Sequence, residues 1–353
     1  VAMHRAKWLL QNVFNKSTDR VLFTTFTVNL ANDILENLKK ICPPELMNRI
    51  DVINLDKWVS NFLHSQGYKN SIVYGDKIEE LWKQAYTVAP DKPNLSIQFY
   101  KEEWSKIIKP LEISSLEGYL KASRTGRGVR LERSDKKAIW PVFEELMNLM
   151  NDNNCRDVDT ALSEARILLQ SKGDILAYKS IIVDESQDLS TSAFKLIRHM
   201  AGPEHENDIF IVGDTHQRIY KKKVILSRCG INIRGRSRNL KLNYRTTEET
   251  RKWAFNILTG IGFDDLDGGA DDGKGYKSLM KGPEPVVKHL SSFNDEVEFI
   301  IKFIDDLQKN TENFDLKNVC LVSRTQEQID AYCEALKNRN YKVYEIKRSK
   351  SEE

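Results

Sequence analysis

The 353-residue sequence is too long for a single compact core and predicts two or three domains. Its 40% apolar and 30% charged residues are typical of a soluble globular protein, and no apolar run approaches the roughly 18 residues that a membrane-spanning helix needs. The formal net charge of +3 is too small to indicate nucleic-acid binding by itself, so the local distribution of charge matters more.

The first elements along the chain predict a strand between two helices. Residues 1–10 have the pattern of an amphipathic helix, and the apolar, threonine-rich residues 21–27 predict a strand, which a helix near 29–40 follows. Residues 65–150 differ in character, because they contain tryptophan-anchored helical patches and a basic segment. We expect this stretch to be a mostly helical insertion.

Alternation of strands and helices resumes after the insertion. The pattern predicts, in order, a helix at 158–171, a strand at 180–184, a helix at 190–200 and a strand at 209–214. Strands that alternate with helices imply βαβ units and a parallel sheet. The fold class predicted for the chain is therefore α/β.

The last third of the chain restarts the same alternation. After a helix near 247–259 and a loop at 266–275 that is rich in glycine and aspartate, the pattern predicts strands at 286–290, 319–323 and 341–346 and helices near 294–309 and 326–338. This region looks like part of a second α/β domain.

The segment 181–190 (IIVDESQDLS) is the most informative in the sequence. A run of β-branched residues predicts a buried strand, and Asp184, Glu185, Gln187 and Asp188 follow at its carboxyl end. Ligands of open parallel sheets bind at that end of the strands, where a carboxylate pair can hold Mg²⁺ on a nucleotide and orient an attacking water. The alternative is a strand-end turn whose acidic side chains are simply solvated.

Two downstream patterns weigh against that alternative. A predicted strand ends in Asp214, and Gln217 three residues later can reach the terminal phosphate of a nucleotide. Further on, Tyr244 and Arg245 stand side by side before a helix, so that the ring can stack on a base and the guanidinium can contact a phosphate. Each pattern alone is a turn or a helix cap more often than a site, and only their order and spacing make them informative.

In this order and spacing, DESQD, GDTHQRIY and LNYRT resemble the UvrD/Rep-like branch of the superfamily 1 helicases. Residues 21–33 are similar to the segment that follows the P-loop of that family, and residues 319–336 are similar to the opening of its second motor domain. The resemblance implies a RecA-like parallel-sheet motor domain with a mostly helical accessory insertion, plus part of a second RecA-like domain. The implied limits are 1–64 with 151–240 for the first motor domain, 65–150 for the insertion and 241–353 for the second motor domain.

The resemblance also implies roles for single residues. Asp184 would hold Mg²⁺, Glu185 would position or activate the attacking water, and Gln217 would sense the γ-phosphate of ATP. Tyr244 would stack on adenine, and Arg245 would contact the γ-phosphate from the domain interface. The remaining residues expected to bind the nucleotide, or to link it to the path of the DNA, are Gln187, Asp188 and Asp214.

The residues that the resemblance places on single-stranded DNA in the two motor domains are Thr25, Phe26, Thr27 and Arg324. For Phe26 the alternative is a place in the hydrophobic core. Many relatives have a base-stacking aromatic after the position of Tyr220, but this sequence has the basic stretch 221–238 without one. Stepping by base stacking is therefore in doubt at that point, whereas phosphate contact is compatible with the sequence.

A second basic segment lies inside the predicted insertion. Arg124, Arg127 and Arg130 recur at three-residue intervals and are interrupted by glycines, a pattern that suits contact with an irregular phosphate backbone. The alternative is a surface loop whose arginines pair with nearby acids.

The phosphate-binding loop of the family, G-x-x-x-x-G-K-[ST], is absent from the sequence and is expected just before Val1. Residues 268–274 fit part of the pattern, but Gly275 stands where Ser or Thr should bind Mg²⁺, and two acids lie inside the would-be anion site. We interpret this segment as a flexible acidic linker, and the chain as a fragment that ends partway into the second motor domain.

The predicted function is that of an ATP-dependent DNA helicase or translocase that moves 3′ to 5′ on single-stranded or partly duplex DNA, with ATP and Mg²⁺ between two RecA-like domains. The chain by itself is expected to be inactive. The alternative is a non-unwinding, helicase-like module that binds nucleic acid or uses nucleotide as a switch to remodel a protein–nucleic acid complex. Five cysteines without C-x-x-C spacing fit a cytoplasmic protein with neither a zinc site nor disulfides, and no membrane contact is expected.

Overall fold

The computed structural model describes residues 1–124, 127–173, 176–218, 224–264, 270–271 and 275–346. The chain divides into two compact units. The first unit comprises residues 1–239 with 261–274, and the second comprises residues 240–260 with 275–353. Among the described residues, no helix combines the length and the apolar character needed to span a bilayer.

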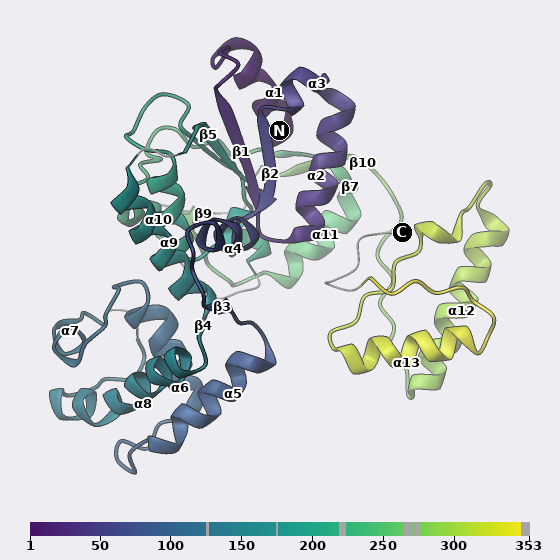
Figure 1. Ribbon diagram of the computed structural model, residues 1–353. Coiled ribbons are helices and arrows are strands. Elements are labelled where there is room, and N and C mark those ends of the chain that lie inside the picture. Colours follow the sequence, from purple (N-terminus) through teal and green to yellow (C-terminus); the bar gives the residue numbers. More distant parts are fainter. Residues whose placement is uncertain (125–126, 174–175, 219–223, 265–269, 272–274, 347–353) are drawn as a thin grey trace. The chain divides into compact units, whose positions relative to one another are not determined.

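The first unit is built around a parallel sheet of four strands in the order β2-β1-β5-β6 (Figure 1). The strands are β1 (Arg20–Thr25), β2 (Ile50–Asn54), β5 (Tyr178–Val183) and β6 (Ile209–Ile211). In the register of the sheet, Phe23 of β1 lies between Val52 of β2 and Ile182 of β5. The nearly continuous apolar runs of β1 and β5 explain their central position, because both faces of a parallel sheet are covered by helices.

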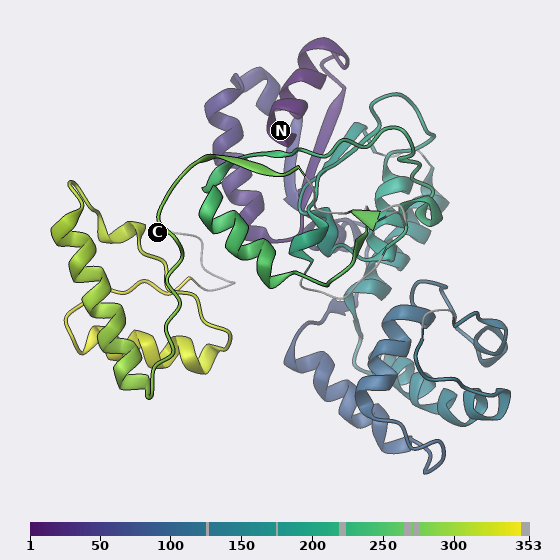
Figure 2. The ribbon, with the colours of Figure 1, turned by 180° about the vertical axis from the view of Figure 1, so that it is seen from behind.

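Helices cover both faces of this sheet, as Figures 1 and 2 show. One layer contains α1 (Ala2–Asn12), α2 (Val28–Ile41) and α3 (Pro44–Met47), and the other contains α4 (Leu55–Ser65), α9 (Val158–Lys172) and α10 (Thr191–Met200). Successive residues of β1 pack on opposite faces of the sheet. Leu22 packs with α4, α9 and α10, whereas Phe23 packs with α1 and α2. The predicted α/β fold with a parallel sheet is confirmed.

A helical insertion interrupts the first unit between β3 (Ser71–Ile72) and β4 (Cys155–Arg156), which pair in parallel. Its helices are α5 (Asp76–Ala85), η1 (Tyr86–Val88), α6 (Ile97–Glu103), the π-helical η2 (Trp104–Ile108), α7 (Leu116–Lys121) and α8 (Arg133–Asp152). They enclose a separate hydrophobic core that includes Trp82, Trp104, Trp140 and Phe143. The tryptophan-anchored patches of the sequence are therefore core positions of this insertion.

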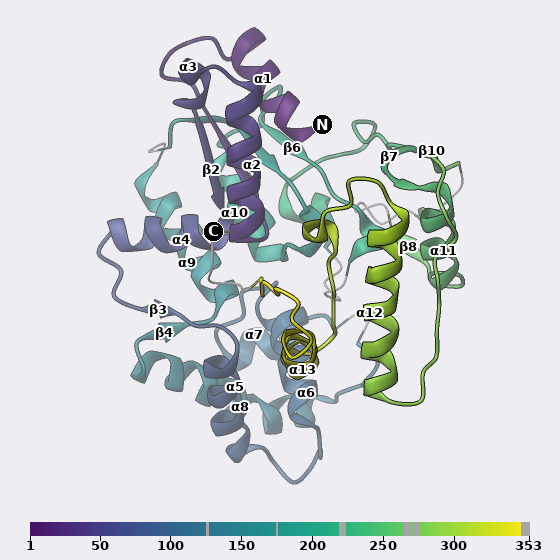
Figure 3. The ribbon, with the colours of Figure 1, turned by 90° about the vertical axis from the view of Figure 1, so that its right-hand side faces the viewer.

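The second unit contains a two-stranded parallel sheet and two longer helices. β7 (Leu242–Thr247) pairs with β10 (Lys277–Met280), and α11 (Glu248–Ile257) follows β7 directly. α12 (Phe293–Asn310) and α13 (Gln326–Lys337) are both labelled in Figure 3. They pack through Phe293 and Tyr332, whose ring centroids are 5.1 Å apart. The short η6 (Leu316–Asn318) lies between these helices in the chain.

The strands predicted at 286–290, 319–323 and 341–346 do not form, and that part of the prediction is wrong. Apolar side chains in these segments are exposed instead, for example Val322 at 83% and Ile346 at 72%. An extended segment becomes a strand only when a neighbouring strand pairs with its backbone N–H and C=O groups, and none of the three segments pairs with a strand in the described part of the chain.

The loop predicted at 266–275 lies mostly outside the described residues. Its described residues Ala270–Asp271 form β9, which pairs in antiparallel fashion with β8 (Phe263–Asp264). The P-loop-like pattern at 268–274 is therefore only partly described, and its interpretation as a flexible linker stays a prediction.

Candidate nucleotide site

The carboxyl ends of β1, β5 and β6 bring together the residues predicted to bind nucleotide. Asp184, which follows β5, donates its backbone N–H to the carbonyl of Thr24 in β1 (2.9 Å), and Val212 after β6 donates to the carbonyl of Val183 in β5 (2.8 Å). The N–H of Ser186 then donates to the carbonyl of Val212 at 3.1 Å. These bonds continue the ladder of the sheet past its strand ends, so the DESQD turn is fixed to both neighbouring strands.

Glu185 adopts a backbone conformation that is rare for a residue with a side chain. Its φ of 50° and ψ of 42° lie in the left-handed region, which costs about 1–3 kcal/mol for a non-glycine residue. The N–H of Glu185 donates to Oδ1 of Asp184 at 3.1 Å, and its Oε2 accepts from Nε2 of Gln187 at 2.6 Å. This strained turn fixes the two adjacent carboxylates at the edge of the sheet where ligands bind.

A close approach between two strand-end loops requires glycine at position 213. A Cβ atom there would overlap Oγ of Ser186 and would lie 2.9 Å from Oε1 of Gln187. The open space lets the buried Gln187 accept a hydrogen bond from the backbone N–H of Asp214 at 3.0 Å. Gln187 therefore connects Glu185, which follows β5, with Asp214, which follows β6, and the sequence pattern alone did not reveal this connection.

Asp214 organises the second loop, which continues into η4 (Thr215–Gln217). Its Oδ1 accepts from the backbone N–H of His216 at 3.0 Å, and Nδ1 of the His216 side chain also lies 3.0 Å from that oxygen. Its Oδ2 accepts from Nε2 of Gln217 at 2.9 Å. Gln217 is exposed, so the residue predicted to sense the γ-phosphate is held by Asp214 at an accessible position.

The oxygen atoms at this edge fit a magnesium–nucleotide complex. Mg²⁺ is usually held in proteins by one or two carboxylates together with phosphate and water oxygens, and Asp184 supplies a carboxylate on a fixed turn. Thr25 follows Thr24, whose carbonyl accepts the N–H of Asp184. The hydroxyls of Thr25 and Ser186 are both buried, and each of these residues is 1% exposed. Neither hydroxyl forms a hydrogen bond with any residue in the described ranges, so both can serve a phosphate or a metal-bound water.

The motor-domain residues predicted to contact DNA differ in exposure. Thr25 is buried, and Phe26 is half-buried and packs against the hydrophobic core beneath α4, α9 and α10, in line with its core alternative. Thr27 is exposed, and its hydroxyl accepts the N–H of Leu30 at 3.3 Å as the N-cap of α2. Contact between any of the three predicted residues and DNA stays a prediction.

Tyr244, Arg245 and Arg324 belong to the second unit. Tyr244 and Arg245 lie within β7, where Oδ1 of Asn243 accepts the N–H of Arg245 at 2.8 Å. Tyr244 is 68% exposed, and both arginines are exposed as well. Their side chains are accessible, and their roles towards nucleotide or DNA stay predictions.

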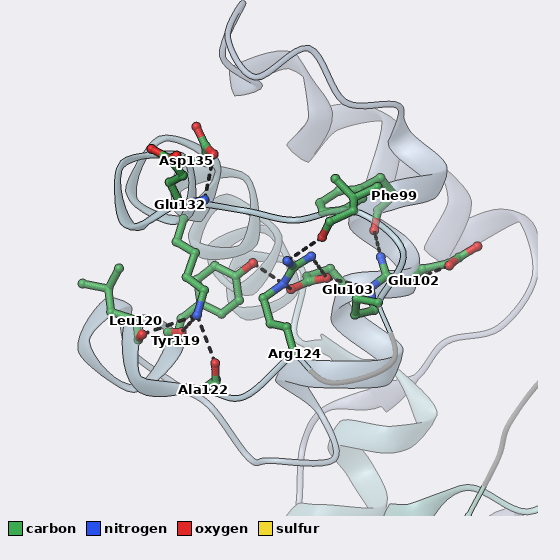
Figure 4. Close-up of polar contacts among 12 residues, drawn as sticks. Phe99, Glu102, Glu103, Tyr119, Leu120, Ala122, Arg124, Glu132 and Asp135 are labelled. Atoms are coloured by element: carbon green, nitrogen blue, oxygen red, sulfur yellow. Dashed lines mark hydrogen bonds and ion pairs between the residues drawn. The ribbon is translucent and has the colours of Figure 1, made fainter.

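Two arginines of the insertion, Arg124 and Arg127, belong to a buried network around Glu103, and Figure 4 shows Arg124 beside Glu103 and Tyr119. Oε2 of Glu103 accepts from Nη2 of Arg124 and from Nε of Arg127, both at 2.9 Å, and Oε1 accepts from the hydroxyl of Tyr119 at 2.8 Å. The side chains of Arg124 and Arg127 are only 9% and 8% exposed, and that of Glu103 is fully buried. Arg127 also forms an ion pair with Glu102 at 2.7 Å.

The structure favours the alternative for Arg124 and Arg127, because their guanidinium groups pair with acids inside the insertion, and contact between these two arginines and DNA stays a prediction. Burial by itself would raise the pKa of Glu103, but the hydrogen bonds and charges of Arg124, Tyr119 and Arg127 outweigh it and lower this pKa below its usual value of 4.5. Arg130 is exposed and stays a candidate for contact with nucleic acid. Tyr220 and the basic residues 221–223 lie outside the described residues.

Comparison with known proteins identifies the family. Residues 1–223 match the family described as the UvrD/REP helicase N-terminal domain. The chain is 23% identical over 348 residues to a probable DNA helicase II homolog of Mycoplasma pneumoniae, with 90% of this chain and 46% of the relative covered. It is 24% identical over 194 residues to the ATP-dependent DNA helicase UvrD1 of Mycobacterium tuberculosis, with 50% of this chain and 24% of the relative covered.

A probable DNA helicase II homolog of Mycoplasma capricolum is 22% identical over 334 residues, with 88% of this chain and 43% of the relative covered. The chain thus spans less than half the length of these curated relatives. Since the family match covers more than half of the sequence and agrees with the parallel sheet and its strand-end motifs, the chain belongs to the UvrD/REP helicase family.

Proposed function

We propose that the protein containing this chain is an ATP-dependent DNA helicase or translocase that moves 3′ to 5′ on single-stranded DNA. The observation that carries the proposal is the connected set of Asp184, Glu185, Gln187, Asp214 and Gln217 at the carboxyl ends of β5 and β6. Carboxylates and amides, of which this set has three and two, are groups that position metal, phosphates and water for phosphoryl transfer. ATP would be hydrolysed between the first motor domain and a second one.

The roles proposed for single residues follow from their partners. Glu185 accepts a hydrogen bond from a neutral amide, so its second oxygen can orient a water molecule and accept its proton. Asp184 would hold Mg²⁺, which when bound neutralises charge on the phosphate oxygens. Gln217 would exchange its bond to Asp214 for one to the terminal phosphate, and in this way report whether that phosphate is present.

The experiment that tests this proposal is an ATPase assay on the gene product that carries this chain, with and without single-stranded DNA. We expect DNA to stimulate hydrolysis, and a parallel strand-displacement assay to show unwinding from a 3′ single-stranded tail. Absence of stimulation by any single strand would refute the motor. Unwinding only from a 5′ tail would refute the proposed direction and leave the motor intact.

A non-unwinding nucleotide switch is the second candidate function. It is favoured by one observation, namely that Arg124 and Arg127 pair with Glu102 and Glu103 inside the insertion. Nucleotide binding without stimulation of hydrolysis by any single strand, and without displacement of a strand in either orientation, would select this candidate.

For the 353-residue chain tested alone, we propose weak affinity for ATP, because its sequence contains no G-x-x-x-x-G-K-[ST] loop. Tight, Mg²⁺-dependent binding in a calorimetric titration of this chain with ATP would contradict that expectation. We also propose a cytoplasmic protein, since its five cysteines are free thiols in the structure, as is usual in a reducing compartment.

A further inference from the structure

A cavity lies at the edge of the sheet opposite to the candidate nucleotide site. It has a volume of about 740 Å³, within the range of roughly 300–1,000 Å³ that is usual for small-molecule sites. Tyr178 and Lys179, which line it, are the first residues of β5, whereas Asp184 follows the last residue of the same strand. At about 3.3 Å per residue, the two sites are separated by roughly 20 Å along β5.

Part of the cavity lining is apolar and buried. Leu169 of α9, Met200 of α10 and Cys229 of η5 (Leu226–Cys229) are 3%, 3% and 6% exposed. The half-buried ring of Tyr178 joins them. The accessible apolar surface for a flat aromatic ligand comes from Tyr178 and from the half-buried Leu176, which also lines the cavity.

The rest of the lining is strongly basic, with one described carboxylate, Glu112, facing five cationic side chains: Arg166, Lys179, Lys195, Arg198 and Arg228. Three of these cations already have acidic partners. Glu112 pairs with Arg166 at 2.7 Å and with Lys195 at 2.9 Å, and Arg198 pairs with Asp208 at 2.7 Å.

Lys179 and Arg228 remain, and neither forms an ion pair with a residue in the part of the chain that the structure describes. Both are exposed, and Nε of Arg166 is a buried donor that makes no hydrogen bond with the described residues. A buried donor without a partner is destabilising, and an anionic acceptor in the cavity would satisfy it.

Stabilisation of a helix end is the alternative explanation for the basic residues that line this cavity. Basic residues near the carboxyl end of a helix stabilise its dipole, which accounts for Arg198 in the last turn of α10. That explanation does not apply to Lys179, which lies in β5, and it applies weakly to Arg228, because η5 is a single 3-10 turn of four residues.

We propose that this cavity binds a phosphate-bearing nucleotide unit, with the base against Leu176 and Tyr178 and the phosphate against Lys179 and Arg228. The same chemistry is found in a free nucleoside monophosphate and in one unit of a single-stranded nucleic acid. Because the cavity is distant from Asp184 along β5, its ligand is a second one and not the ATP that the motor would hydrolyse.

Photolabelling of the 353-residue chain tests the proposal without any need for ATP hydrolysis. The probes are azido-adenosine monophosphate and an octathymidylate that contains thiothymidine, and labelled peptides are located by mass spectrometry. We expect at least one probe to label the peptide that contains Tyr178 or Met200. The double variant Lys179→Glu with Arg228→Glu should weaken that labelling roughly tenfold or more, since two charge-assisted contacts are reversed.

A matched control reverses two exposed lysines outside the cavity, Lys69→Glu with Lys83→Glu, and should leave the labelling unchanged. Circular dichroism checks that both double variants fold. Labelling by the monophosphate alone would identify a free nucleotide as the ligand, and labelling by the oligonucleotide alone would identify a strand. The proposal is overturned if neither probe labels these peptides, or if the cavity variant and the control behave alike.

Discussion

Two glutamates of the first unit, Glu185 and Glu103, show how the same side chain is used in opposite ways. Glu185 is half-buried on a strained turn and is held by the neutral amide of Gln187. Glu103 is fully buried and is held by two guanidinium groups and a phenol. The charge of Glu185 is left for a ligand or a water, whereas the charge of Glu103 is neutralised inside the fold. A charged residue in a sequence therefore indicates function only when its partners are known.

The largest effect is expected for Glu185→Gln. If Glu185 activates water, this variant should hydrolyse ATP about 10²–10⁴-fold more slowly while it still binds nucleotide and DNA, because the shape of the side chain is kept and its basicity is lost. The measurement is DNA-stimulated ATPase activity of the gene product that carries this chain, with the exposed Glu117→Gln as a control. Unchanged turnover would remove Glu185 from the mechanism, and neither Glu185 nor Glu103 would then have a role in hydrolysis.

The next effect is expected for Glu103→Ala, which leaves two buried arginines without their carboxylate. Removal of one partner from a buried ion pair destabilises a protein by about 3–5 kcal/mol. Hydrogen exchange resolved by peptide should show the loss in α6 and α8. Glu117→Ala breaks a pair with Lys121 whose side chains are 78% and 75% exposed, and it should change stability by about 1 kcal/mol or less. Equal, small changes in both variants would show that the buried network contributes little.

Acid should weaken the same network, by less than truncation does, because a protonated Glu103 still fills its place. The folded-state pKa of Glu103 lies below its usual value of 4.5, so the stabilisation is fully present above that pH. It is lost as the pH falls from 4.5 through the folded-state pKa. Peptide-resolved exchange between neutral pH and pH values below 4.5 should show α6 and α8 losing protection. Glu103→Gln should reduce this dependence, and the part that stays belongs to Glu102, whose pKa is also lowered by Lys106 and Arg127.

A smaller effect is expected for Gly213→Ala at the nucleotide site. The added methyl group would overlap Ser186 and crowd Gln187, and overpacking of this kind costs about 1–3 kcal/mol. Gly128→Ala is the control, since a Cβ atom there meets nothing within 4 Å. Chemical denaturation measures both variants, and equal stability would mean that the loops after β5 and β6 need not approach closely.

The smallest effect is expected for Arg130→Ala, which tests the exposed one of the three insertion arginines predicted to contact DNA. If Arg130 contacts a phosphate, the slope of log affinity against log salt should fall by about 0.7 for a single strand, with no loss of stability. Fluorescence anisotropy of a labelled oligonucleotide at several salt concentrations gives this slope. An unchanged slope would remove the last arginine of the segment from the DNA interface.

Local sequence was sufficient wherever one segment carries its own signal. The apolar runs of β1 and β5 predict buried strands because a parallel sheet is covered on both faces, and the polar residues after β5 and β6 then fall at the ligand-binding edge. The same signal failed at 286–290, 319–323 and 341–346, since apolar character favours a strand but does not supply the neighbour with which it must pair.

By itself the sequence determined the parallel α/β core, the helical insertion and the family, because strand-end motifs and helical periodicity are read within a few residues. Only the tertiary structure decided which charged side chains are paired inside the fold and which are accessible to a ligand. The pairing of Arg124 with Glu103 joins residues that are 21 positions apart in the sequence. The close approach at Gly213 permits a hydrogen bond between Gln187 and Asp214, which are 27 positions apart. Such contacts depend on how helices and strands pack, and no local pattern encodes them.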